Sequence, residues 1–179
     1  MWLTLIAGLY LAAGIYWFGR RKPGYSNRIH TISELGERGS VVQWQVSWGV
    51  FFPVGVALLL VWFMERQHNP ESAALAAVIA VGYLGGAIFP CDPGSPLNGS
   101  WSQGIHNLAG GVEYYGGVAC LWVLSRNHSA FLVPTVVVAI AIPLISLPLG
   151  HSVRGAAQRA AEVCLFVGLA AALVVQSAA

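Results

Sequence analysis

An acidic side chain lies inside a long apolar segment of the chain. Glu113 stands in the run from Ile105 to Leu124, and His106 precedes it by seven residues. Residues 106, 110, 113 and 117 share one helical face, so His106 and Glu113 are expected on a common stripe. Ionisable groups at membrane depth belong to proton paths, ion paths or active sites, or they bond a neighbouring helix and stabilise packing. The sequence leaves both interpretations of Glu113 open.

A second polar stripe occurs near the C-terminus. His151, Arg154, Gln158 and Glu162 are spaced by three or four residues, which places them on one helical face. Glu162 is therefore a second candidate for a protonatable group within the membrane. Arg159 precedes Glu162 by three residues, and an ion pair between the two is the alternative.

Three histidines and one aspartate form a candidate metal set, namely His30, His106, His151 and Asp92. Neutral imidazoles and a carboxylate suit a divalent ion such as zinc, which activates a bound water by lowering its pKa. Without a metal, Asp92 and His106 are a candidate acid/base pair in which the carboxylate orients the imidazole. Ser33 and Glu113 complete the candidate catalytic residues, although no HExxH or GxSxG motif accompanies them.

Each of these residues also has an ordinary structural interpretation. His30 is then an interfacial histidine, and Asp92 caps a turn or the start of the next helix. Prolines at positions 90, 93 and 96 stiffen the loop around Asp92, so we expect an ordered cap. In the first loop, Thr31 and Glu34 have the spacing of a capping box, which predicts a short helical segment.

Composition excludes several classes of protein. Of the 179 residues, 56% are apolar and 9% are charged, and the mean hydropathy is +0.66. A soluble domain carries about 25% charged residues, so the composition excludes a soluble protein. The net charge of +2 is too small for a nucleic-acid surface, so we expect membrane lipids and no nucleic acid as partners.

The apolar runs predict an all-α fold, a bundle of six transmembrane helices in a single domain over residues 1–179. A spanning helix needs about 20 mostly apolar residues. Six runs qualify, and the loops between them leave no room for a soluble domain. They are Trp2–Phe18, Trp44–Met64, Ser72–Phe89, Ile105–Leu124, Ala130–Leu149 and Ala157–Ser177. Pro53, Pro143 and Pro148 fall within these runs, where each removes a backbone hydrogen bond. Glycines gather in the third and fourth runs, which are expected to be central.

Cations are distributed unequally between the two sides that six spans would create. The odd-numbered loops hold Arg20, Arg21, Lys22, Arg28, Arg38, Arg154 and Arg159, whereas only Arg66 and Arg126 lie opposite. The positive-inside rule then places the odd loops in the cytoplasm and both termini outside, and we expect the plasma membrane. The cations that follow the first run reverse the charge order of a signal peptide, so a retained anchor is expected.

Three ordered motifs resemble those of the bacterial and archaeal membrane proteins called domain of unknown function 998. They are His-Thr-Ile-Ser-Glu-Leu-Gly at 30–36, Gly-Gly-Ala-Ile-Phe-Pro-Cys-Asp-Pro-Gly at 85–94 and His-Asn-Leu-Ala-Gly-Gly at 106–111. The resemblance implies a six-helix integral membrane protein with Ser33, Asp92 and His106 at motif positions, and it implies no activity. A looser similarity to alkaline ceramidases and adiponectin receptors, which hold zinc near the cytoplasmic ends of their helices, is a reason to test for metal.

Three functions remain open from the sequence. The first is a membrane-embedded hydrolase or other enzyme that acts on a lipid-like substrate at the cytoplasmic face. The second is a small transporter, or a proton or lipid pathway, that uses His106, Glu113 and Glu162. The third is a structural or accessory subunit whose polar residues only pack helices. The sequence does not determine the oligomeric state.

Overall fold

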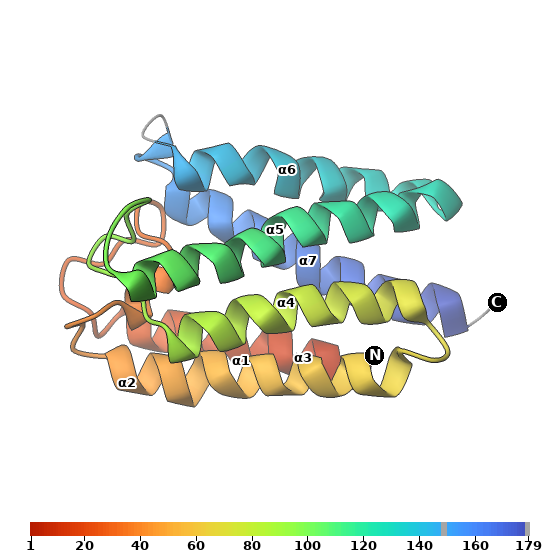
Figure 1. The fold of residues 1–179 in the computed structure, drawn as a ribbon, viewed down its shortest axis with the longest axis horizontal. Coiled ribbons are helices and arrows are strands. Elements are labelled where there is room, and N and C mark those ends of the chain that lie inside the picture. Colours follow the sequence, from red (N-terminus) through yellow and green to blue (C-terminus); the bar gives the residue numbers. More distant parts are fainter. Residues whose placement is uncertain (148–149, 178–179) are drawn as a thin grey trace.

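The computed structural model describes residues 1–147 and 150–177, and all regular structure in these ranges is helical (Figure 1). The predicted all-α class is therefore confirmed. The elements are α1 (Trp2–Gly19), η1 (Ser33–Gly36), α2 (Gln43–Val46), η2 (Ser47–Phe51), α3 (Phe52–Glu65), α4 (Pro70–Ile88), α5 (Trp101–Asn127), η3 (Ser129–Phe131), α6 (Leu132–Ser146) and α7 (Arg154–Ser177).

The long helices lie side by side, and α2, η2 and α3 join into one continuous rod (Figure 1). Within the described ranges, five helices are long and apolar enough to cross a membrane. They are Trp2–Gly19, Gln43–Glu65, Pro70–Ile88, Ser129–Ser146 and Arg154–Val175. The 27-residue α5 runs along α4 for the length of the bundle, but it does not belong to this group. Its Gln103, His106, Asn107 and Glu113 make it more polar, so the sixth span stays a prediction.

The helices begin and end within a few residues of the apolar runs in the sequence. α5 begins at Trp101 because the Ser100 hydroxyl caps it by accepting a hydrogen bond from the Gln103 N–H at 3.3 Å. α7 begins at Arg154, and the Ala156 N–H in its first turn donates to the Arg28 carbonyl of the first loop at 3.0 Å. Leu149 and Pro148, at the predicted end of the fifth run, lie outside the described residues.

Glycines, which have no side chain, allow α4 and α5 to approach closely. A Cβ at Gly85 would overlap the Cβ of Ala109, and a Cβ at Gly116 would lie 2.8 Å from Cγ1 of Val78. Of the spanning window in α4, 56% is buried, against 17% in α1. α4 is therefore central, as its glycines predicted, whereas α1 is peripheral.

The π-helical turn η2 lies just before Pro53 in the rod formed by α2, η2 and α3. Pro53 has no N–H to donate to the Gly49 carbonyl four residues earlier. The Tyr10 hydroxyl on α1 donates to that carbonyl instead. π-helical turns of this kind are frequent at functional sites, and Phe51 at the end of η2 reaches the cavity described below.

The first and third loops and the start of α7 meet at one end of the bundle (Figure 1). The Arg38 N–H donates to the Cys91 carbonyl at 2.9 Å, and Glu37 Oε2 accepts from the Gly94 N–H at 2.7 Å. Arg154 donates through Nη1 to the Gly94 carbonyl at 3.0 Å. These bonds tie the loops into one ordered cap, as the prolines of the third loop predicted.

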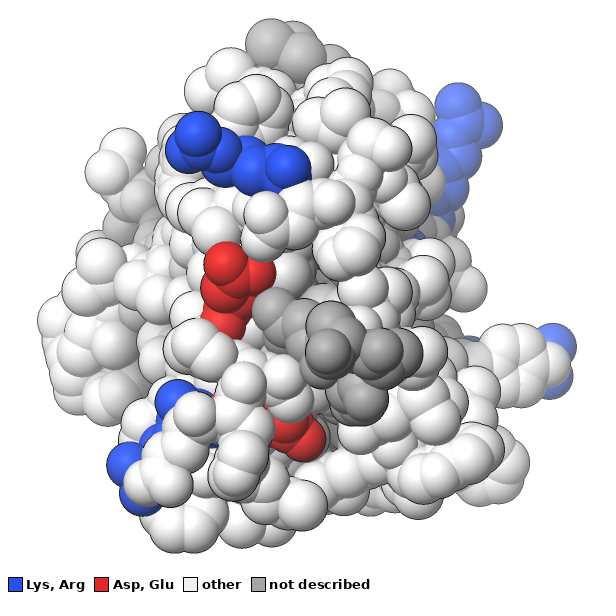
Figure 2. All heavy atoms as spheres, turned by 90° about the vertical axis from the view of Figure 1, so that its right-hand side faces the viewer, with Lys and Arg blue, Asp and Glu red and all other residues white. Residues whose placement is uncertain are grey.

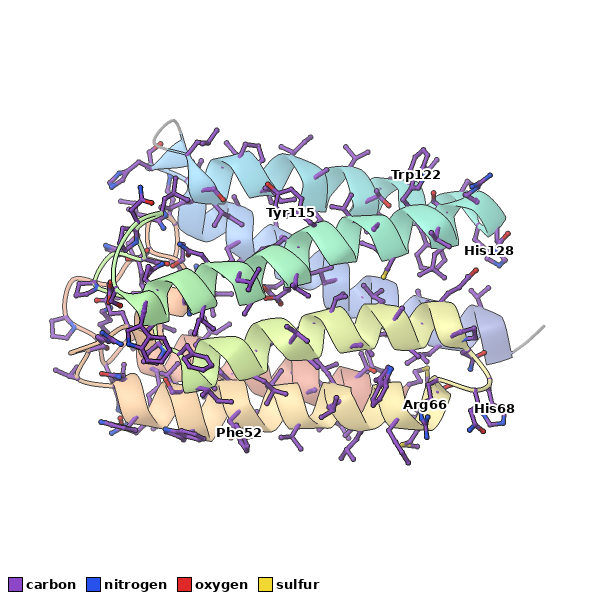
Figure 3. The ribbon with its side chains drawn as sticks, in the orientation of Figure 1. Phe52, Arg66, His68, Tyr115, Trp122 and His128 are labelled. Carbon is purple, nitrogen blue, oxygen red and sulfur yellow. The ribbon has the colours of Figure 1, made fainter. Side chains whose placement is uncertain are left out.

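The opposite end of the bundle carries only short connections. Its surface shows few charged side chains (Figure 2). His68 and His128 lie at this end, together with Arg66 (Figure 3).

Candidate functional site

A cavity of about 40 Å³ lies inside the bundle, large enough for water. It is enclosed by α4, α5, α7, the end of η2 and the start of η1. Its lining is unusually polar for the centre of an apolar bundle. The lining residues are Ile32, Ser33, Phe51, Gly82, Tyr83, Gly86, His106, Gly110, Glu113, Tyr114, Gln158 and Glu162.

Glu162 on α7 is held by two tyrosines from two other helices. Its Oε2 accepts a hydrogen bond from the Tyr83 hydroxyl of α4 at 2.7 Å, and its Oε1 accepts from the Tyr114 hydroxyl of α5 at 2.6 Å. All three side chains are buried. The predicted alternative, an Arg159–Glu162 ion pair, is wrong, because Arg159 donates instead to the carbonyls of Asn27 and His30.

Gln158 extends this network to the first loop. Its Nε2 donates to the Tyr114 hydroxyl at 2.9 Å, and its Oε1 accepts from the Ile32 N–H at 2.6 Å. A continuous series of hydrogen bonds therefore joins Ile32 to Tyr83 through Gln158, Tyr114 and Glu162. The series connects the loop end of the bundle to its interior.

Glu113 is the exception in this network. It is buried, and among the described residues its Oε1 has no hydrogen-bond partner. A Cβ at Gly82 would overlap the Glu113 carboxylate, so the glycine of α4 makes room for it. Glu113 and Glu162 both line this cavity. No ion pair to either glutamate is formed within the described ranges.

His106, in the second turn of α5, lines the same cavity. Its Nδ1 lies 3.0 Å from the Phe89 carbonyl oxygen, a contact that requires the proton on Nδ1. In the neutral ring Nε2 is then the acceptor. His106 and Glu113 therefore share one face, as the helical period predicted. Ser33 also lines the cavity, so three of the four candidate catalytic residues reach it.

Asp92, the fourth, is not among the residues that line this cavity. Its carboxylate accepts from the Ser100 N–H at 2.6 Å and from the Ser100 hydroxyl at 2.8 Å. Arg38 Nη1 lies 3.6 Å away. The Ser100 bonds, with a smaller contribution from Arg38, hold the pKa of Asp92 below its usual value. Asp92 therefore bonds to Ser100, the N-cap residue of α5, and these bonds do not involve His106.

The candidate metal ligands do not come together. His30 Nδ1 accepts from the Ser26 N–H at 2.9 Å, and its ring stacks on Tyr25. His151 is exposed in the turn that precedes α7. In residues 1–147 and 150–177, no three His, Cys, Asp or Glu side chains are grouped so as to hold a metal ion. His30, His106 and Asp92 each have a partner of their own, namely Ser26, the Phe89 carbonyl and Ser100.

Two features of the loop end confirm or extend the sequence analysis. Thr31 and Glu34 form the predicted capping box: Glu34 Oε1 accepts from the Thr31 N–H at 3.0 Å, and Thr31 Oγ1 accepts from the Glu34 N–H at 3.3 Å. Cys91 donates through its thiol to the Ser33 carbonyl at 3.4 Å, and burial raises its pKa to about 12. Sequence reasoning missed Tyr83 and Tyr114 as partners of Glu162, because nothing local marks residues that meet from different helices.

Comparison with known proteins identifies the family. The model of a family described as protein of unknown function, DUF998, matches residues 5–175. Neither a curated protein nor a solved structure matches the chain. The matched range includes the cavity and the loops that cover it. The chain therefore belongs to the DUF998 family of proteins of unknown function.

Proposed function

We propose that the chain is a small proton-linked transporter or proton pathway, in which Glu113 and Glu162 bind and release protons. The observation that carries the proposal is the unpartnered Glu113 oxygen beside Glu162 in a cavity with room for water. Ionising two buried carboxylates together without a cation costs more than holding a proton. Such a pair is therefore a proton-binding site rather than a pair of fixed charges.

His106 supplies the connection toward the loop end. It lines the cavity on the same helix face as Glu113, and its Nε2 is an acceptor when Nδ1 holds the proton. Histidine changes its charge near neutral pH, so it suits a proton-transfer step between solvent and buried acids. In this proposal a proton passes between His106 and the two glutamates.

The hydrolase hypothesis has less support from the geometry. Sites for small molecules usually have volumes of about 300–1,000 Å³, far more than this cavity. Asp92 is bonded to Ser100, the N-cap residue of α5, and no described group of candidate ligands could hold a metal ion. Ser33, His106 and Glu113 still share a cavity, but it accommodates water and not a lipid.

The proposal includes the topology. All of residues 1–179 form one domain of six spans in the plasma membrane, with α5 as the sixth span and the long loops in the cytoplasm. The unequal distribution of cations supports this orientation, and α5 lies parallel to the other rods (Figure 1). We expect Tyr25→Cys to be labelled only from inside and Asn69→Cys to be labelled only from outside. The opposite pattern would reject the orientation.

The test of proton binding uses purified protein in proteoliposomes. A pH-sensitive dye inside the vesicles reports flux under an applied pH gradient. We expect flux in the native protein and its loss in Glu113→Gln and Glu162→Gln, because glutamine keeps hydrogen bonding but cannot titrate. Glu65→Gln is the matched control, since its partner Asn69 retains an acceptor.

An infrared measurement makes the test independent of any transported substrate. A protonated buried carboxyl has its own C=O band, which Glu113→Gln or Glu162→Gln should remove and Glu65→Gln should leave. Full flux in Glu113→Gln, or the absence of any carboxyl band that these substitutions remove, would refute the proposal.

A further inference from the structure

A long apolar groove of about 490 Å³ runs between α1 and α7. Gly8 and Ala12 line it on α1, and Val163 and Val167 line it on α7. α1 buries few of its residues, namely Thr4, Ala7 and Leu11. The volume falls within the usual range for a ligand site, about 300–1,000 Å³.

The length of the groove matches one leaflet of a membrane. Its lining on α1 extends from Thr4 to Tyr16, which is about 18 Å along a helix at about 1.5 Å per residue. Half of a hydrocarbon core is about 15 Å. A single acyl chain that runs along the helices therefore fits its length and its apolar walls.

Uncompensated positive charge borders one end of the groove. Arg159 lines it and donates to backbone carbonyls and to the Tyr25 hydroxyl, but within the described ranges it has no carboxylate within 4.0 Å. Arg20 lies 4.2 Å from the ring centroid of Tyr16, which lines the same end. Glu162 contributes to the wall, but both of its oxygens are bonded to tyrosines of α4 and α5.

We infer that this groove binds one acyl chain of an anionic phospholipid, with the lipid phosphate beside Arg159. An apolar channel of leaflet length with a cation at its interfacial end is complementary to that class of lipid. The inference does not depend on the proton-linked function. Ile32 and Glu162 line both the groove and the buried cavity, so a bound chain would contact the wall of the carboxylate site.

The test uses the full chain in nanodiscs of phosphatidylcholine that contain a small fraction of photoactivatable lipid. The probes are phosphatidylglycerol and phosphatidylcholine with the same diazirine-labelled acyl chain. After illumination, mass spectrometry locates the adducts. We expect adducts on the groove residues of α1 and α7, with about tenfold more from the anionic probe, as one charge-assisted contact implies.

Two substitutions make the test specific. Ala12→Phe fills the groove and should abolish the adducts, whereas Ala13→Phe, at an exposed position beside it, should leave them unchanged. Arg159→Gln should remove the preference for the anionic probe. The inference would be overturned by equal labelling in the two phenylalanine variants or by equal labelling with the two probes in the native protein. Cross-links between the α1 helices of two copies would also overturn it.

Discussion

Removal of one hydroxyl from the bundle interior should be costly. Tyr114 donates to Glu162 and accepts from Gln158, so Tyr114→Phe breaks two interhelical hydrogen bonds. Tyr83→Phe breaks one, the bond to the other oxygen of Glu162. The phenyl ring keeps the packing of each tyrosine, so the hydrogen bonds account for the difference.

The magnitude follows from the number of bonds. Interhelical hydrogen bonds in a membrane protein average about 0.6 kcal/mol and reach about 1.7 kcal/mol. Tyr83→Phe should therefore lower the free energy of unfolding by about 0.6–1.7 kcal/mol. Tyr114→Phe should lower it by about 1.2–3.4 kcal/mol, because each of its two partners loses a bond.

Reversible unfolding in mixed micelles, followed by circular dichroism, measures these differences. Tyr115→Phe is the matched control, because Tyr115 is exposed on the outer side of the same helix (Figure 3). Its free energy of unfolding should not change. The reasoning is refuted if Tyr115→Phe costs as much as Tyr114→Phe, or if Tyr83→Phe costs more than Tyr114→Phe.

Two further predictions concern the loop end. Burial raises the pKa of the Cys91 thiol to about 12, so this thiol should resist maleimide at pH 7–8 until the protein is denatured, whereas Asn98→Cys in the same loop should react at once. Mass spectrometry in a Cys120→Ser/Cys164→Ser background measures the labelling. Rapid labelling of native Cys91 would contradict the prediction. The pKa of Asp92 is lowered in the folded state, so its stabilising effect is present above the unfolded value of about 3.8 and is lost as the pH falls through the folded value. Unfolding measured from pH 6 downward should therefore show a loss of stability below about pH 4 that is smaller in Asp92→Asn. Identical pH profiles would exclude the bonds between Asp92 and Ser100 as its source.

Local patterns in the sequence determined much of the structure. The lengths and composition of the apolar runs predicted the helices, because burial of helical backbone in an apolar medium requires such runs. The helical period placed His106 and Glu113 on one face, and a spacing of three residues predicted the capping box of Thr31 and Glu34. These relations depend only on residues within a few turns of one another.

Only the tertiary structure decided which partner each polar group takes. Arg159 bonds to the first loop rather than to Glu162, and Asp92 bonds to Ser100 at the start of α5 rather than orienting His106. Glu162 lies between Tyr83 and Tyr114, which are separated from it by 79 and 48 residues. The competing partners of a buried carboxylate differ little in chemistry and greatly in position. The packing of α4, α5 and α7 therefore decides the outcome, and no local pattern records that packing.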